Sequence, residues 1–240
     1  MLAEPSAQPN QSLIDGIRTL QALAVSPEPI GCRALARQLE LDTSKVNRLL
    51  RTLAYLGIAR QTTNRKYTPG PGMHVLAAQS LFASGLIHRS LPALERLRRF
   101  GHTVAMAVLW HDSVSYLYHA PPGVDSAQAV ARIGVLPACT SGIGMALLAR
   151  LPDDVLGRIY TDREIPGYPG GLPALLERLE EVRRDGFIRL RGSTGEDRHT
   201  IAIAVGDPVY AGIGVSGWLP EPATADLVAA LRVAADEIGP

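Results

Sequence analysis

Residues 32–57 read CRALARQLELDTSKVNRLLRTLAYLG and contain two helical patterns separated by a turn. The first pattern covers Cys32 to Leu39, and Glu40-Leu41-Asp42 leaves room only for a tight turn. Thr43-Ser44 offers good N-cap residues for the second helix. Gly57 closes that helix as its C′ residue. The stretch therefore predicts two short helices joined by a turn.

The second of these helices has one apolar and one polar side when its residues are placed at about 100° per residue. Its apolar sector contains Val46, Leu49, Leu50, Leu53 and Leu56. Its polar side contains Ser44, Asn47, Arg48, Arg51 and Tyr55, with Lys45 at the edge. We expect the apolar side to pack and the polar side to offer hydrogen-bond donors to a partner.

The flanking segments complete a recognisable order. A helix begins near Ser12, which can serve as its N-cap, and Pro27 and Pro29 stop it. Residues 58–68 read as a short hairpin whose polar turn carries Arg65 and Lys66. Helix, helix, turn, helix and hairpin is the order of a winged helix-turn-helix, in which the third helix enters the major groove of DNA.

Pro69-Gly70-Pro71-Gly72 is the clearest boundary in the sequence. We expect a disordered tail over residues 1–11, a winged helix-turn-helix over 12–70, a linker helix over 71–85 and a second domain over 86–240. The second domain interleaves strand-like runs (103–110, 114–119, one or two strands within 126–136, a hairpin over 200–215) with helical patterns (86–100, 140–151, 172–184, 224–238). This irregular alternation predicts an α+β domain with one antiparallel sheet.

Charge is distributed unevenly along the 240 residues. The net charge is only +1, but residues 1–70 carry nine Lys/Arg against five Asp/Glu, and the rest carries fifteen against eighteen. The positive potential is therefore concentrated where phosphate contacts would be needed. The sequence contains no run of 18 apolar residues and no signal peptide, so we expect a cytoplasmic protein without a membrane contact.

Cysteine and histidine placement argues against cofactor or metal chemistry. Cys32 and Cys139 stand far apart without a C-x-x-C partner, so neither a disulfide framework nor a cysteine-rich zinc site is expected. His102, His111 and His119 lack a carboxylate that would complete a metal ligand set. We expect no cofactor and no metal.

These residues resemble the IclR-type transcriptional regulator family over nearly the whole chain from Ser12. Residues 34–53 are similar to the family's helix-turn-helix, and Tyr67 and Gly70 match the end of its wing. Pro137 with Thr140-Ser141-Gly142-Ile143-Gly144-Met145-Ala146 resembles the family's strand-to-helix signature, and residues 201–205 and 215–217 resemble two late strands. The resemblance implies a GAF-like effector domain, dimers or tetramers, and a ligand near the strand-to-helix turn.

The helix start at residues 140–144 presents backbone N–H groups that can hold a carboxylate. With the resemblance, we predict an effector site from Leu136, Thr140, Ser141, Gly142, Ile143, Ala204, Gly214 and Ser216. The alternative is a tightly packed turn whose glycines are needed for steric reasons. Met145, Ala204 and Gly214 replace frequent lysine, proline and small polar residues of the family, which favours an apolar or aromatic acid. Glu40 replaces a turn glycine, which costs about 1 kcal/mol if its φ is positive.

We therefore expect a homodimeric transcriptional regulator, not an enzyme, that binds a two-fold symmetric operator in double-stranded DNA. Arg48 and Arg51 are expected to reach guanine edges or phosphates and Asn47 an adenine. Ser44, Lys45, Arg65 and Lys66 are better suited to phosphates. Two alternatives stay open. One is an enzyme that uses Cys139 or a histidine, and the other is a protein-interaction module whose helix-turn-helix has lost its DNA contacts.

Overall fold

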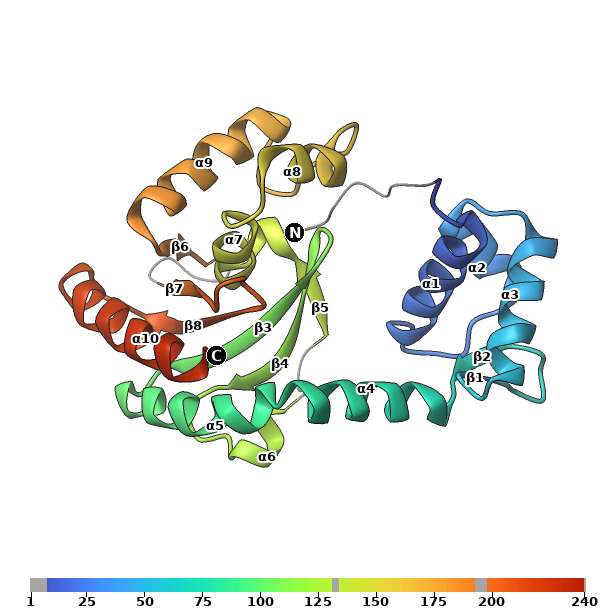
Figure 1. The fold of residues 1–240 in the computed structure, drawn as a ribbon, viewed down its shortest axis with the longest axis horizontal. Coiled ribbons are helices and arrows are strands. Elements are labelled where there is room, and N and C mark those ends of the chain that lie inside the picture. Colours follow the sequence, from blue (N-terminus) through green and yellow to red (C-terminus); the bar gives the residue numbers. More distant parts are fainter. Residues whose placement is uncertain (1–7, 131–133, 193–197, 240) are drawn as a thin grey trace. The chain divides into compact units, whose positions relative to one another are not determined.

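The structure, a computed structural model, describes residues 8–130, 134–192 and 198–239. The chain divides into two compact units, one up to Gly85 and one from Leu86 onward (Figure 1). Each unit is described by itself. Among the described residues, no helix is both long enough and apolar enough to span a membrane. Residues 1–7 of the predicted N-terminal tail lie outside the described residues.

The first unit is a winged helix-turn-helix, as predicted. Its elements are α1 (Gln11–Ala24), α2 (Cys32–Leu39), α3 (Thr43–Tyr55), β1 (Ala59–Gln61), β2 (Tyr67–Pro69) and α4 (Pro71–Ser84). The apolar sides of the first three helices meet in one core, in which Leu23, Leu35, Val46 and Leu50 are fully buried. β1 and β2 pair antiparallel and form the wing.

Two helices in this unit begin earlier than predicted. Asn10, rather than Ser12, caps α1, and its side chain accepts a hydrogen bond from the backbone N–H of Leu13. Asp42, rather than Thr43-Ser44, caps α3 by accepting from the N–H of Lys45 at 3.0 Å. Asparagine and aspartate are at least as good as serine in this role. The residues predicted as caps therefore lie inside the first turns.

The turn between α2 and α3 contains the expected strain. Glu40 adopts the left-handed conformation with φ 56° and ψ 40°. Leu41 then closes the helix end by donating its N–H to the carbonyl of Ala36 at 3.0 Å. A residue with a Cβ pays for this conformation with about 1 kcal/mol, so a glycine at position 40 would relieve the turn.

α4 begins directly at Pro71, where the linker helix was expected to start, because proline is well suited to the first position of a helix. Gly70 is needed for close approach, since a Cβ there would lie 2.4 Å from the carbonyl oxygen of Gly57. α4 lies entirely in the described range 8–130, and none of its residues is buried. The Pro-Gly run therefore starts a helix in which Met73 of the first turn packs against the core of its unit, while Val75, Leu76 and Phe82 further along are exposed.

The second unit is an α+β domain, as predicted. Its helical elements are α5 (Leu86–Leu97), η1 (Arg98–Phe100), α6 (Ser126–Ala129), η2 (Ala138–Thr140), α7 (Gly142–Leu148), α8 (Asp153–Tyr160), α9 (Gly171–Asp185), η3 (Glu221–Ala223) and α10 (Thr224–Ile238). Its strands are β3 (Thr103–Trp110), β4 (Ser113–Ala120), β5 (Val135–Pro137), β6 (Ile188–Arg191), β7 (Arg198–Val205) and β8 (Ala211–Trp218).

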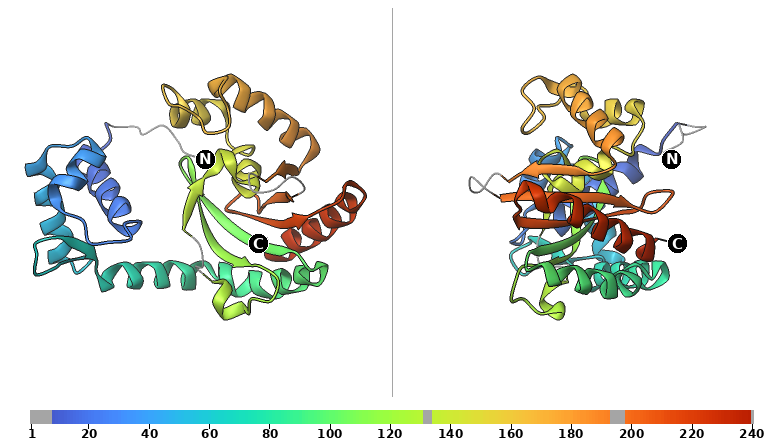
Figure 2. Two further views of the ribbon diagram at one scale, coloured as in Figure 1. Left: turned by 180° about the vertical axis from the view of Figure 1, so that it is seen from behind. Right: turned by 90° about the vertical axis from the view of Figure 1, so that its left-hand side faces the viewer.

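The six strands form one antiparallel sheet in the order β5-β4-β3-β8-β7-β6. α5 and α10 cover one face, and α7 with α8 and α9 lies on the other (Figures 1 and 2). Alternate side chains of β7 and β8 serve the two cores: Ile201 and Ile213 face α5 and α10, whereas Ala202 and Gly214 face α7. The sheet thus places small residues opposite α7.

Sequence patterns missed two elements of this unit and predicted others that are longer than those observed. α8 and the edge strand β6 were not predicted. The described residues 126–130 and 134–136 contain the short helix α6 and the first two residues of strand β5. α7 ends at Leu148 instead of continuing to Leu151. α6, β5 and β6 have only three or four residues each, so their periodicity covers too few residues to stand out.

Candidate nucleic-acid interface and effector site

The outer side of α3 carries the polar residues predicted for DNA recognition. Ser44, Asn47, Arg48 and Arg51 are all exposed, while Val46 and Leu50 on the opposite side are fully buried. In the described part of the chain, neither Arg48 nor Arg51 is held in an ion pair. The helix therefore presents donors to solvent from a side whose orientation is fixed by packing.

Lys45 differs from its neighbours on α3. Its ammonium group forms an ion pair with the carboxylate of Asp15 in α1. The Asp15 side chain is completely buried, and that of Lys45 is 30% exposed. Lys45 holds the pKa of Asp15 below its usual value, against the opposing effect of burial. Spacing along the chain does not reveal this pair, because it depends on how α1 and α3 pack.

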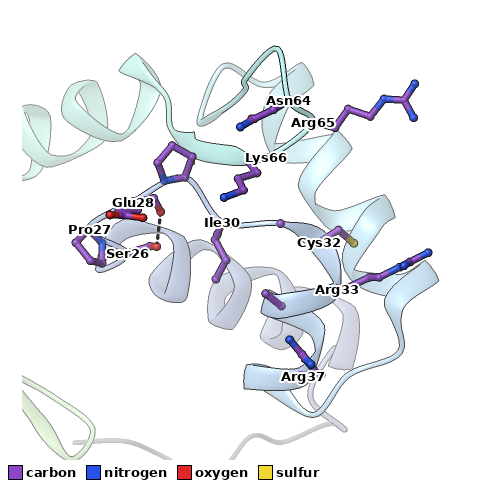
Figure 3. Close-up of a pocket in the computed structure, with 13 residues that line it drawn as sticks. Ser26, Pro27, Glu28, Ile30, Cys32, Arg33, Arg37, Asn64, Arg65 and Lys66 are labelled. Atoms are coloured by element: carbon purple, nitrogen blue, oxygen red, sulfur yellow. Dashed lines mark hydrogen bonds between the residues drawn. The ribbon is translucent and has the colours of Figure 1, made fainter.

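A groove of about 870 Å³ lies between the wing, the α1–α2 connection and α2 (Figure 3). Its lining includes the predicted residues Arg65 and Lys66, and it adds Arg33 and Arg37, which were not predicted. Lys66 and Asn64 reach in from the wing, whereas the Arg65 side chain points away from the groove floor (Figure 3). Arg33 and Arg37 are one turn apart on α2, a spacing that could have revealed a common face.

In the second unit, the turn into α7 is closed by hydrogen bonds. Ser141 caps α7 by accepting from the N–H of Gly144 at 3.1 Å, and its Oγ lies 2.8 Å from the hydroxyl of Tyr116. Ser141 is only 5% exposed, and burial raises the pKa of Tyr116. Both hydroxyls therefore stay neutral at ordinary pH and act as hydrogen-bond groups.

The glycines of this turn are required for packing. A Cβ on Gly144 would lie 2.2 Å from the carbonyl oxygen of Ala138, and one on Gly142 would lie 2.6 Å from Cγ2 of Thr200. A Cβ on Gly214 would meet the Cβ of Ala202 at 3.1 Å. These contacts support the steric explanation for the glycines, because an added side chain would collide with neighbouring residues.

The predicted effector residues are only partly brought together. Gly142, Ile143 and Gly214 pack against one another or the same strands on the α7 side of the sheet. Ser216 lies on that side too and accepts a hydrogen bond from Thr200 at 3.1 Å. Two of the predicted residues face solvent: Thr140 is exposed, and Leu136 is 44% exposed in β5. Ala204 packs against the core on the α7 side and lines a cavity of about 190 Å³ together with Ala146.

Two polar side chains near this turn were missed by sequence reasoning. Tyr116 in β4 contacts Ser141, and Thr200 in β7 contacts Ser216. The ring of His119 lies edge-on to that of Tyr116, with centroids 6.0 Å apart. Strand alternation in β4 and β7 would have placed these residues on the face of α7, had the sheet order been known.

Cys139 is buried just before α7, and its thiol contacts the carbonyl oxygen of Pro166 at 3.4 Å. Burial raises the pKa of Cys139, so at neutral pH the sulfur is a thiol and a poor nucleophile. Within residues 8–130, 134–192 and 198–239, no three His, Cys, Asp or Glu side chains gather as a metal site would require.

An exposed, polar recognition helix in a winged helix-turn-helix, followed by a separate α+β domain, is the architecture of a two-domain transcriptional regulator. Comparison with known proteins identifies the family. Residues 13–63 match the IclR helix-turn-helix domain, and residues 78–239 match the bacterial transcriptional regulator IclR C-terminal domain. The chain belongs to the IclR family of transcriptional regulators, which combine a DNA-binding helix-turn-helix with an effector-binding domain.

Individual relatives agree with this assignment. The HTH-type transcriptional regulator BhcR of Paracoccus denitrificans is 28% identical over 206 residues, which cover 76% of this chain and 69% of that protein. The crystal structure of an IclR family regulator from Brucella abortus superposes with a TM-score of 0.77 at 23% identity and covers 99% of this chain and 94% of its own. An IclR homologue from Microbacterium hydrocarbonoxydans, complexed with 4-hydroxybenzoate, has a TM-score of 0.66 at 23% identity and covers 95% and 99%.

Proposed function

We propose that this protein binds a two-fold symmetric operator in DNA as a homodimer or dimer of dimers. Binding of an organic acid then changes its affinity for the operator. The outer side of α3 carries this proposal. Arg48 and Arg51 stand exposed beside Asn47 on a helix whose other side is fully packed. Arginine recognises guanine edges and phosphates, and asparagine recognises adenine, so this side has the donors that base reading needs.

The basic groove next to α3 supplies phosphate contacts in this proposal. Arg65 and Lys66 come from the wing, and Arg33 and Arg37 come from α2. Phosphate contacts fix the position of a protein on the duplex without reading its sequence. We assign residues 12–70 to this DNA-binding module, 71–85 to a linker helix and 86–240 to the effector domain.

α4 supports the proposed dimer. It contains no Asp, Glu, Lys or Arg over its 14 residues. Val75 and Leu76 are 53% and 52% exposed, and Phe82 is 89% exposed. Exposing such an uncharged apolar helix to water is unfavourable. A second copy of the chain would bury it in a closed two-fold interface.

We place the effector at the turn into α7, between this helix and the small residues of β7 and β8. Tyr116, Ser141, Thr200 and Ser216 offer hydroxyl groups there, and the surrounding side chains are apolar. This lining suits an aromatic acid, and the relative with 4-hydroxybenzoate supports the same class. The turn would have to open for the effector to enter, because Ser141 is nearly buried. The raised pKa of Cys139 speaks against the alternative of a thiol-dependent enzyme.

The test is a titration of the intact chain with DNA from its own promoter region, followed by fluorescence anisotropy over a series of salt concentrations. We expect the logarithm of the association constant to fall linearly with the logarithm of salt concentration, with a slope of about −0.9 for each phosphate contacted. Adding 4-hydroxybenzoate or benzoate should shift the affinity. If DNA binding is weak and independent of salt, the regulator hypothesis is wrong and the protein is better explained as a protein-interaction module.

A further inference from the structure

Asp15 is an unusual residue for its position, because it is a carboxylate whose side chain is 0% exposed on a helix of the DNA-binding unit. Three groups surround it. The Nζ of Lys45 forms the close ion pair, the amide of Gln11 donates to Oδ1 at 2.9 Å, and Nη1 of Arg18 lies 4.0 Å from Oδ1. Two of these groups come from α1 itself, so Lys45 is the contact that joins α1 to α3.

α1 and α3 lie side by side next to Asp15. A Cβ built on Gly16 would lie 3.7 Å from Cδ2 of Leu49, an ordinary van der Waals distance, so this part of α1 is a direct neighbour of α3. Lys45 and Leu49 are one turn apart and share the side of α3 that faces α1. Lys45 therefore lies between the packed side of the helix and its exposed side.

The charges explain why the lysine stays there. A buried carboxylate without a partner is strongly unfavourable, and removing one member of a buried pair leaves the other uncompensated. If Lys45 turned toward a phosphate, it would leave Asp15 buried with only Gln11 and the more distant Arg18. Its positive charge is thus already compensated before DNA arrives.

We propose that Asp15 is a positioning residue that holds Lys45 against α1 and keeps the positive charge of Lys45 away from the DNA backbone. This inference rests on the proposed function. Asp15 has two effects at once: it fixes the start of α3 against α1, and it limits the phosphate contacts of each subunit. Fewer phosphate contacts weaken sequence-independent binding, so the remaining donors of α3 contribute a larger share of the recognition.

The decisive variant is D15N/K45M, in which both charges are replaced by neutral side chains of similar size. Exchanging a buried ion pair for neutral groups of similar volume is often tolerated. We expect the salt slope for promoter DNA to equal that of the wild type. K66M provides the matched control, because loss of a wing lysine that contacts phosphate should make the slope shallower by about 0.9 per subunit.

The single variant D15N tests directly whether Asp15 keeps Lys45 away from the DNA backbone. Lys45 then keeps its charge but loses its partner, and its flexible stem can turn toward the DNA. We expect a slope steeper than that of the wild type by about 0.9 per subunit and tighter binding to unrelated DNA. A thermal melt of each variant, followed by circular dichroism, establishes that the comparison is between folded proteins.

The outcomes separate this inference from the proposed function. If D15N/K45M has a slope shallower by about 0.9 per subunit, Lys45 leaves Asp15 to contact DNA, and the inference is overturned. An unchanged slope in D15N overturns it as well, since the released lysine would not reach a phosphate. If the wild type itself shows no salt-dependent binding, the proposed function fails and takes this inference with it.

Discussion

α3 and α7 begin in the same way and serve opposite purposes. A side chain caps each of them: Asp42 accepts from Lys45 N–H at 3.0 Å, and Ser141 accepts from Gly144 N–H at 3.1 Å. α3 then leaves a whole polar side in solvent, whereas every residue of α7 is buried. Packing therefore dictates the residues of α7, while the outer side of α3 is free to be selected for binding.

Gly144→Ala tests the packing of α7 and should have the largest effect. The new methyl group would lie 2.2 Å from the carbonyl oxygen of Ala138 and 2.6 Å from its Cα, and both belong to the backbone of the same turn. We expect a loss of about 3 kcal/mol from the free energy of unfolding. Trp110 and Trp218 are the only tryptophans and both lie in the second unit, so fluorescence during urea unfolding monitors this unit.

Gly157→Ala in α8 is the matched control. It makes the same chemical change within a helix of the same unit, but apart from the chain neighbours and the backbone of α8 itself, no described atom lies within 4 Å of the added Cβ. Alanine is favoured over glycine in a helix by about 1 kcal/mol, so this variant should be slightly more stable than the wild type. Equal stabilities for the two variants would show that the α7 glycine is not needed for packing.

Arg48→Ala tests the exposed side of α3. We expect promoter affinity to fall by about 1 to 3 kcal/mol, because a contact to a base edge or phosphate is lost, and the melting temperature to stay unchanged. Anisotropy titrations at several salt concentrations distinguish the two contacts. A base contact leaves the salt slope intact, whereas a phosphate contact makes it shallower by about 0.9 per subunit.

Arg158→Ala in α8 removes an exposed arginine from the other unit and should leave promoter affinity unchanged. Its side chain pairs with Asp154 one turn away, an exposed pair that contributes little to stability. If both arginine variants weakened binding equally, the loss at Arg48 would reflect overall charge, and the assignment of α3 as the reading surface would be wrong.

Sequence patterns predicted the parts of the fold that depend on local periodicity. The helix-turn-helix, the wing, α9, α10 and the antiparallel sheet all follow from amphipathic spacing or strand alternation, and α10 begins and ends where it was predicted, at Thr224 and Ile238. Pairings between distant segments were out of reach. The contact of Asp15 with Lys45 and that of Tyr116 with Ser141 depend on how elements pack, which one-dimensional spacing does not encode.

The two candidate sites were predictable to different degrees for the same reason. A reading surface on a helix is set by spacing within that helix, so the exposed residues of α3 were found directly. An internal site is assembled from several strands and one turn. The predicted set mixed residues that meet, such as Ile143 and Gly214, with Leu136 and Thr140, which face solvent. The strand-to-helix motif located the turn into α7, but it did not identify the strand residues that pack against this turn.

Tyr116→Phe tests the cap of α7 more gently. The variant removes the hydroxyl 2.8 Å from Oγ of Ser141 and leaves the hydrogen bond from Gly144 in place. We expect a loss of about 1 kcal/mol in the free energy of unfolding, measured by tryptophan fluorescence, and a weaker response to 4-hydroxybenzoate. Tyr160→Phe is the control, since the buried hydroxyl of Tyr160 has no hydrogen-bond partner among the described residues. A greater loss in the control would contradict this account of the α7 cap.

The smallest effect concerns acid and the first unit. Lys45 lowers the pKa of Asp15, so in acid the unfolded chain takes up this proton before the folded chain does. The stabilisation from the pair is therefore complete above the unfolded pKa of about 3.9 and is lost as pH falls through the lower, folded value. Hydrogen exchange of α1 amides, corrected for intrinsic rates, should show the wild type losing protection relative to D15N/K45M as pH falls from 7 to 3. A difference that stays constant over this range would mean that the pair contributes equally whether or not Asp15 is charged, which its burial beside a lysine does not permit.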